Sequence, residues 1–366
     1  MFFRRAWIPR EINGVQDWTW GGANGNSPRF FLNTDMCLLF DIETTFPCCT
    51  RTDLTNNNGN QCDRGDTVLS NTPCASYAPG SVRAEAANAV ELFAGLNNNG
   101  GFNNDNSPFY DAFTVAWNKA TTNGLSGLQP LVDGAPIPPP PPPEPSSSPT
   151  AKPTQAPIPI SSCVSQDEYD AIDADIASVS AAFGTDNISR AHFLGGILRL
   201  AAHDFLDFDV NDVSNPMGAD GCIDFDHADN SGFPQDVWCD ECPLTQLHRS
   251  NFLHLSKADF WVAAANAVIR IASNNELDPK STYVSGRVDT ESCDGQGSRL
   301  PAATGCDAVE GVFVDRMNMT LTDGVALLGA HTIGRGDTLF SGHHGIWVDT
   351  EVQSVVSTLH QSCTHI

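Results

Sequence analysis

The chain has 366 residues, and its 19 Lys and Arg against 44 Asp and Glu give a net charge of −25. Nucleic acid and anionic membrane surfaces are therefore disfavoured as partners, because both would repel the chain. Apolar residues make up 40% of the sequence, which excludes general disorder, and no apolar run reaches the roughly 18 residues of a membrane-spanning helix.

The first segment, residues 1–125, is rich in Asn, Gly and Cys. Its middle, residues 47–74, has the composition of loops held together by disulfides. Helical spacing follows at residues 81–95 and again at residues 108–124, where apolar side chains recur on one face and Gly124 suits the end of a helix. We therefore expect a loop-rich region followed by two helices.

Residues 126–160 (SGLQPLVDGAPIPPPPPPEPSSSPTAKPTQAPIPI) are dominated by proline. Proline fixes φ and lacks an amide donor, so the pattern predicts an extended linker. At about 3.1 Å per residue such a linker reaches roughly 100 Å, enough to join almost any two ends of a domain. A ligand for an SH3-type domain is the alternative interpretation.

The second segment, residues 161–353, has mainly helical patterns, and the tail at residues 354–366 matches nothing familiar. Three stretches have helical apolar spacing and begin at a residue suited to N-capping: residues 189–206 at Ser189, 256–272 at Ser256 and 320–335 at Thr322. The first and third of these stretches also carry polar side chains that need an explanation.

Arg199 and His203 lie four residues apart in the first stretch, so they project from one face of a helix. His331 lies near the end of the third stretch, without a Cys or His at zinc spacing, which leaves single-ligand chemistry such as a haem iron. The alternatives are a surface pair of His203 with Asp204 and an ordinary core position for His331.

Twelve cysteines are many for a cytosolic enzyme, and their even number predicts disulfides and an extracellular or cell-wall location. Residues 1–10 nevertheless lack the pattern of a secretory signal. The cysteines divide five and seven between the two segments, which indicates one bridge across the linker or a partner beyond the chain.

Four residues have a spacing close to that of a zinc site (C-x2-C-x5-H-x5-H): Cys239, Cys242, His248 and His254. The gap between the second Cys and the first His is too short for a zinc finger. A loop disulfide between the two cysteines is the preferred interpretation, and a zinc-stabilised binding module is the alternative.

Several motifs of the second segment, taken together, resemble the haem peroxidase superfamily of plants, fungi and microbes. RLAAH resembles the distal helix, where Arg199 and His203 would flank the peroxide, and MGADGCIDFDHADNSGF resembles the next loop, where Asn230 would bond the distal His. LTDGVALLGAHTIGR resembles the proximal helix and makes His331 the expected iron ligand. SKADFWVA and RLP match further family stretches. Trp347 is placed where one branch has a Trp below the proximal His.

The first segment resembles the part of the family that follows the proximal helix. In FFLNTDMCL, Asp35 matches the carboxylate that accepts the N–H of the proximal His, and FTVAWNKATTNG resembles the last family helix. The halves are therefore in swapped order, as in a circular permutant or a piece of a tandem array. The resemblance implies a mainly α, two-lobed fold that is rich in loops, contains disulfides and includes a proline-rich linker.

The resemblance implies haem b as the cofactor, hydrogen peroxide as the oxidant and a small reducing substrate oxidised in one-electron steps, as in the response to oxidative stress. His203 would move the peroxide proton and Arg199 would stabilise developing negative charge. The family has an aromatic residue just before the distal His, and the small Ala202 in this chain opens the space above the iron.

Calcium is implied by a weaker match. Asp204, Gly218 and Asp220 occupy ligand positions of one branch, but Cys222 replaces a serine. The alternative function is a catalytically weak wall or matrix protein built from peroxidase segments, or a truncated fragment of a tandem peroxidase.

Overall fold

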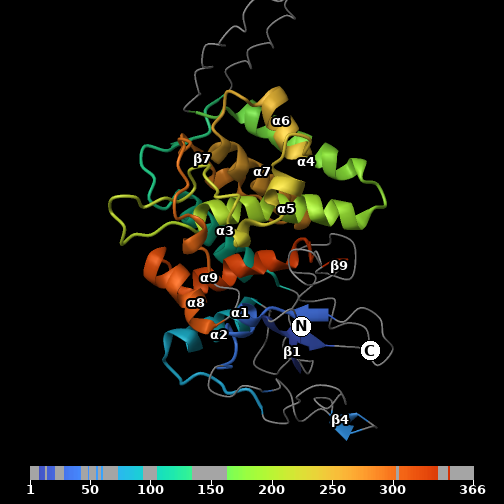
Figure 1. Ribbon diagram of the computed structural model, residues 1–366, viewed down its shortest axis with the longest axis vertical. Coiled ribbons are helices and arrows are strands. Elements are labelled where there is room, and N and C mark those ends of the chain that lie inside the picture. Colours follow the sequence, from blue (N-terminus) through green and yellow to red (C-terminus); the bar gives the residue numbers. More distant parts are fainter. Residues whose placement is uncertain are drawn as a thin grey trace, which may run out of the picture.

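The computed structural model describes residues 8–12, 15–20, 29–42, 48, 55–56, 59–60, 73–93, 105–133, 163–301, 305–336 and 345–346. α-Helices dominate these residues (Figure 1): α1 (Asn33–Met36), α2 (Val82–Phe93), α3 (Ser107–Thr122), α4 (Gln166–Ala182), α5 (Asn187–Phe205), α6 (Pro243–Asn251), α7 (Lys257–Ala272), α8 (Cys306–Glu310) and α9 (Leu321–Leu328). The prediction of a mainly α fold is therefore confirmed.

Short segments of 3-10 or π helix lie between or after the α-helices: η2 (Ala228–Asn230), η3 (Phe233–Val237), η4 (Pro279–Thr282), η5 (Gly297–Arg299), η6 (Gly311–Arg316) and η7 (Gly329–Thr332). The strands are short and pair antiparallel: β1 (Ile8–Ile12) with β2 (Val15–Trp20), β2 with β3 (Arg29–Phe31), β4 (Thr55–Asn56) with β5 (Gly59–Asn60), β6 (Gln129–Pro130) with β7 (Val284–Ser285), and β8 (Arg335–Gly336) with β9 (Gly345–Ile346). Strand β6 lies within the stretch predicted as a linker, residues 126–160, and pairs with β7 of the second segment.

Helix α5 crosses the middle of the molecule. Helices α4, α6 and α7 lie on one side of it, and α8, α9, α1 and α2 lie on the other (Figure 1). The packing agrees with this view, because α7 contacts both α4 and α5, while α9 contacts α2 and α3. The first segment therefore packs against the last helices of the second.

The predicted helices are present, but two of them begin earlier than expected. Ser256 caps α7 as predicted, and Gly124 follows α3 with a left-handed φ of +73°. Helix α5 is capped by Asp186 rather than Ser189, and α9 is capped by Thr320 rather than Thr322. The apolar stripe of each helix starts after its first turn, so spacing alone places the start too late.

The two segments share one hydrophobic core. Phe109 of α3 packs on the end of α9, where a Cβ at Gly329 would lie only 2.6 Å from the Phe109 ring, so this close approach requires glycine. Deeper in the core, the Trp117 indole N–H donates to Asn266 Oδ1 at 2.7 Å. The end of α9 is therefore fixed against α3.

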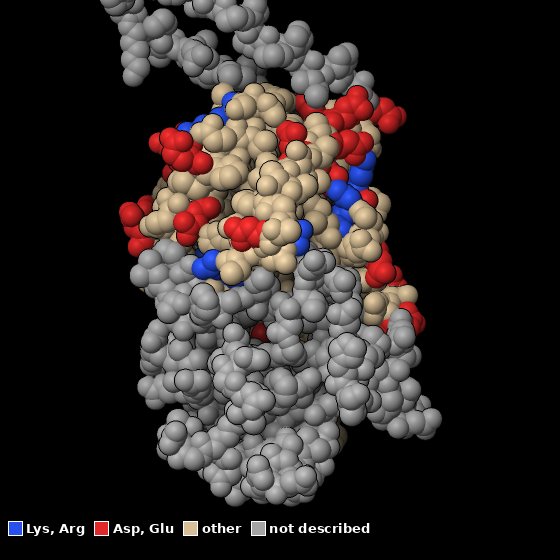
Figure 2. Space-filling view, turned by 90° about the vertical axis from the view of Figure 1, so that its right-hand side faces the viewer, with Lys and Arg blue, Asp and Glu red and all other residues tan. Residues whose placement is uncertain are grey.

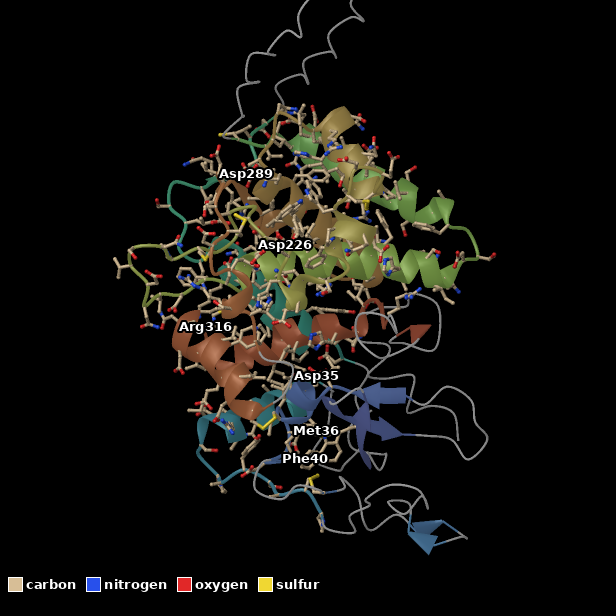
Figure 3. The ribbon with its side chains drawn as sticks, in the orientation of Figure 1. Asp35, Met36, Phe40, Asp226, Asp289 and Arg316 are labelled. Atoms are coloured by element: carbon tan, nitrogen blue, oxygen red, sulfur yellow. A yellow bond between two sulfur atoms is a disulfide. The ribbon has the colours of Figure 1, made fainter. Side chains whose placement is uncertain are left out.

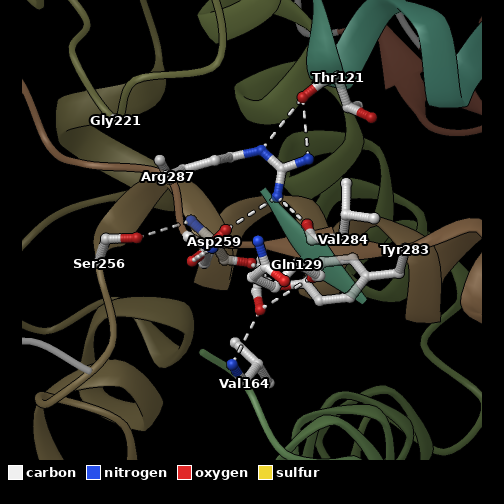
Figure 4. A network of polar contacts seen from close by, with 12 residues as sticks. Thr121, Gln129, Val164, Gly221, Ser256, Asp259, Tyr283, Val284 and Arg287 are labelled. Carbon is white, nitrogen blue, oxygen red and sulfur yellow. Dashed lines mark hydrogen bonds and ion pairs between the residues drawn. The ribbon is translucent and has the colours of Figure 1, made fainter. Parts of the chain in front are cut away.

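A buried ion pair adds a polar connection between the segments (Figure 4). Arg287 Nη1 lies 2.8 Å from Asp259 Oδ1, and both side chains are 1% exposed. The same guanidinium donates through Nε and Nη2 to the carbonyl oxygen of Thr121, at 3.1 and 2.9 Å. These bonds satisfy a buried charge and join the end of α3 to the first turn of α7.

Disulfides confirm two further expectations. Cys48 bonds to Cys74 within the loop region, and Cys37 bonds to Cys306 across the linker. The second bridge joins residues 269 positions apart and fixes α1 to α8. The order of the halves relative to the family, and the domain boundaries, stay predictions.

We expect the double substitution of Cys37 and Cys306 by serine to lower the free energy of unfolding by about 2–5 kcal/mol, because the bridge closes a very long loop. The matched control replaces Cys239 and Cys242, whose bridge spans a sequence separation of only 3 and constrains the unfolded chain far less. Urea denaturation of the two variants measures the difference. Equal losses of stability would contradict this explanation.

Candidate active site

Helix α5 supplies the first pair of candidate side chains. Arg199 and His203 lie one turn apart and are partly buried, while Leu200 and Ala201 between them are in the core. The helical period therefore places both polar side chains on one face, as expected from their spacing.

Asn230, at the end of η2, is fully buried and fixes the orientation of the His203 ring. Its Nδ2 donates to the carbonyl oxygen of Asp224 at 2.8 Å and to Gln296 Oε1 at 2.7 Å, so its Oδ1 is the atom that faces His203. This oxygen lies 2.8 Å from His203 Nδ1, which must then carry the proton. The other ring nitrogen, Nε2, is left as a proton acceptor.

Gln296 was not identified from the sequence, yet it forms hydrogen bonds with both Asn230 and His203. It is fully buried, accepts from Asn230 and donates through Nε2 to the carbonyl oxygen of His203 at 2.8 Å. It lies in a turn far along the chain, so no local motif signals this role.

The surroundings of His203 keep it uncharged. Burial and then the charge of Arg199 lower the pKa of His203 to about 3, although the hydrogen bond with Asn230 opposes this shift. The charge of His331 contributes to the same lowering. At neutral pH His203 is therefore a neutral base.

Arg199 is held by the loop that also carries Asn230. Its Nη1 donates to the carbonyl oxygen of Ser231 at 3.0 Å, and its Nη2 donates to the carbonyl oxygen of Asp229. Its Cζ lies 4.2 Å from the centre of the Phe233 ring. Burial lowers the pKa of Arg199 to about 10, which still leaves the guanidinium charged at neutral pH.

The second candidate pair joins the two segments. His331 lies in η7, directly after α9, and its Nδ1 is 2.9 Å from Asp35 Oδ1. Asp35 is buried in α1, beside Met36, and both lie below α9 in Figure 3. The next residue, Cys37, is bonded to Cys306, so a covalent bridge holds the helix that carries the carboxylate.

Asp35 changes the acid–base behaviour of His331. Burial opposes the charged form of the ring, but the charge and hydrogen bond of Asp35 outweigh it and raise the pKa of His331. The hydrogen bond occupies Nδ1 and leaves Nε2 available. The side chain of His331 is 42% exposed.

The donor atoms of His331 and its partner Asp35 are suited to a haem iron. An imidazole whose second nitrogen is bonded to a carboxylate is a common arrangement of a metal-ligating histidine. Helix α5 lies close to the chain after η7, and a Cβ added at Gly195 would be only 2.5 Å from the Cα atom of Gly334. Ala202, beside His203, is small and partly buried.

The expected calcium ligands have other partners in this structure. Asp204 accepts the backbone N–H groups of Gly221 and Cys222 at 3.1 and 3.0 Å, and Asp220 accepts that of Cys222 at 3.2 Å. Burial, and then the charge of Asp220, raise the pKa of Asp204. In the described part of the chain no three His, Cys, Asp or Glu side chains form a metal cluster, so calcium at Asp204, Gly218 and Asp220 stays a prediction.

Two other expectations have clear outcomes. The zinc interpretation is wrong, because Cys239 and Cys242 are bonded to each other as the preferred loop disulfide. A surface pair of His203 with Asp204 is also wrong, because Asp204 is fully buried and bonds to backbone groups. Trp347 lies outside the described residues. Among those residues, no helix has the length and apolar composition needed to cross a membrane.

Comparisons with known proteins point to the same family. A family model described as peroxidase matches residues 176–365. The chain is 34% identical over 165 residues to cytosolic L-ascorbate peroxidase 2 of Arabidopsis thaliana, covering 44% of this chain and 61% of that protein. It is 32% identical over 160 residues to cytosolic L-ascorbate peroxidase 1 of Oryza sativa subsp. indica, covering 43% and 60%.

A probable peroxisomal L-ascorbate peroxidase 4 of Oryza sativa subsp. japonica is 28% identical over 155 residues, covering 41% of this chain and 49% of that protein. The chain thus spans about half of the length of the curated relatives that it matches. The family model alone covers more than half of this chain and includes Arg199, His203 and His331. The chain therefore belongs to the peroxidase family, the haem peroxidase superfamily that its motifs resemble.

Proposed function

We propose that the chain is a haem-dependent peroxidase that reduces hydrogen peroxide and oxidises a small electron donor. The observation that carries this proposal is the pair of histidines in different states. His203 is a neutral base oriented by Asn230. His331 is hydrogen-bonded through Nδ1 to the carboxylate of Asp35 and has Nε2 available as a ligand. Haem b, when bound through His331, would supply the redox chemistry that cleaves the peroxide bond.

The residues of this chain would move the proton and stabilise the charge. His203 would take a proton from hydrogen peroxide at Nε2 and return it to the departing oxygen, which leaves as water. Arg199 would stabilise the negative charge that develops on that oxygen. Asp35 would hold the Nδ1 proton of His331 and make the ring a stronger electron donor.

The electron donor is proposed to be a small molecule. Figure 2 shows Asp and Glu side chains over the described part of one face, with few Lys and Arg, and the net charge of the chain is −25. Such a surface disfavours an acidic protein as donor. The negative charge favours a neutral or cationic donor such as a phenol. The relatives that the chain matches are named L-ascorbate peroxidases, so ascorbate, although it is an anion, is the other donor to examine.

The test is steady-state turnover of the purified 366-residue chain after loading with haem. We expect peroxide-dependent oxidation of ascorbate or of a phenol, with the donor radical detected by electron paramagnetic resonance. A chain that binds haem but shows no peroxide-dependent turnover with either donor would support the catalytically weak wall protein instead.

We also infer an extracellular or cell-wall location. The support is the number of disulfides within the described residues, which join Cys37 to Cys306, Cys48 to Cys74, Cys222 to Cys293 and Cys239 to Cys242. Disulfides persist in oxidising compartments and are rare in the cytosol. Recovery of the protein from the wall or medium fraction of its cells would test this location.

A further inference from the structure

One aromatic side chain contacts both of the proposed distal residues. Phe233 is fully buried, and the Arg199 Cζ lies 4.2 Å from the centre of its ring. The His203 ring stands perpendicular to the Phe233 ring, with 5.2 Å between the two centres. Position 202, where the family resemblance implies an aromatic residue, holds alanine in this chain.

The local backbone holds Phe233 firmly against α5. Gly232 before it has a φ of +93°, in the left-handed region that favours glycine, and its N–H donates to Gln235 Oε1 at 3.1 Å. Phe233 then begins η3, in which Val237 packs so closely on α5 that a Cβ at Gly196 would lie 2.7 Å from Val237 Cγ2. The ring therefore has little freedom to move away from α5.

The Arg199 guanidinium has two kinds of contact, hydrogen bonds to backbone carbonyl groups and the contact with the Phe233 ring. The hydrogen bonds to the carbonyl oxygens of Asp229 and Ser231 hold the edge of the group. Within the described residues no carboxylate forms an ion pair with Arg199. The Arg199 Cζ also lies over the negative face of the Phe233 ring, an attraction that grows where water is excluded.

We propose that Phe233 is a positioning residue of the distal site, which holds the Arg199 guanidinium and the His203 ring in fixed relative orientation. It would thereby supply the aromatic surface that Ala202 does not. The segment from Asp229 to Phe233 would then orient both distal residues, because its Asn230 already bonds His203. This inference rests on the proposed peroxidase function.

The test compares Phe233→Leu with Phe225→Leu. Both changes remove an aromatic ring from the same cluster, since the two ring centres are 6.4 Å apart, but the ring contacts recorded for Arg199 and His203 are to Phe233. A Phe233→Met variant has a longer, flexible side chain that can fill an irregular gap left by the ring, and it serves if the leucine variant folds poorly. Circular dichroism and thermal unfolding establish that each variant is folded.

The first readout needs no haem. In the haem-free chain, the side-chain Nε–H resonance of Arg199, assigned through Arg199→Lys, should carry a ring-current shift. We expect Phe233→Leu and Phe233→Met to remove that shift and Phe225→Leu to keep it. In the haem-loaded chain, we expect Phe233→Leu to slow the reaction with peroxide about tenfold and to leave the KM for the donor unchanged.

Two failures are distinguishable. An unshifted Arg199 resonance in the wild-type chain, or one that does not change in a folded Phe233→Leu variant, would overturn the positioning role. A wild-type chain that binds haem without reacting with peroxide would instead overturn the proposed function, while the resonance measurement would still decide whether Phe233 holds Arg199.

Discussion

Replacing His203 with leucine is expected to slow the reaction of the haem-loaded chain with hydrogen peroxide by about 10²–10⁴-fold, the usual contribution of a positioned general base. The physical reason is the free Nε2, which accepts a proton because Asn230 fixes the proton on Nδ1. Leucine keeps much of the volume but cannot accept a proton. Stopped-flow absorption measures the rate, and haem binding should be unchanged.

The matched control for this prediction is His192→Leu. His192 lies on the same helix, about three turns before His203, and forms an ion pair with Asp236 at 3.5 Å. Its replacement should leave the peroxide reaction within about twofold of the wild-type rate, since His192 is too far along the helix to accept the same proton. Similar losses in both variants would show that the effect comes from α5 as a whole and not from the base.

The pH dependence of the same reaction has a definite sign. His203 acts as a base in its neutral form, and burial together with Arg199 lowers its pKa to about 3. The rate constant should therefore stay constant as pH falls from neutrality and decrease only near about pH 3, as Nε2 becomes protonated. A decrease near pH 6 to 7, about the ordinary pKa of histidine, would contradict the lowered value.

Replacing His331 with alanine is expected to abolish tight binding of haem. His331 is the residue whose Nε2 is left available by the bond between Nδ1 and Asp35, and alanine offers no ligand. The haem absorption band should be lost from the purified variant, and free imidazole should partly restore it. His254→Ala, which removes a histidine paired with Glu168 at 2.6 Å, is the control and should bind haem normally.

Asp35 gives this binding its own pH dependence. A histidine must be neutral to bind a metal, and Asp35 raises the pKa of His331, so protons compete with iron at higher pH than for an ordinary histidine. Haem affinity in the wild-type chain should fall as pH decreases through that raised pKa. In Asp35→Asn the decrease should occur at lower pH, because the charge that raises the pKa is gone.

Much of this site could be predicted from the sequence, because its elements have local signatures. The four-residue spacing of Arg199 and His203 and the apolar stripe before His331 are properties of single helices. Motifs that resemble a family added Asn230 and Asp35. The contact between His331 and Asp35 joins positions 296 residues apart, so spacing within one helix could not have revealed it.

The rest depends on tertiary packing that leaves no local pattern. Gln296 contacts Asn230 and His203 from a turn that lies far from α5 in the sequence. Phe233 contacts His203 from η3, where no periodic pattern of apolar residues marks it. Apart from the bridge between Cys239 and Cys242, the partners of the cysteines could not be assigned, since many pairings satisfy the same count. Two helix starts were placed too late for a local reason, because the apolar stripes used to find them begin about one turn after the capping residues Asp186 and Thr320.

The most direct test of the central claim, that residues on both sides of the linker form one haem site, is a haem titration followed by absorption. The purified chain is titrated beside Asp35→Ala, a change in the first segment only. The account predicts saturation at one haem per wild-type chain and a weakened affinity, about tenfold or more, without Asp35. Saturable binding that is the same in both, or no saturable binding to the folded wild-type chain, would contradict it.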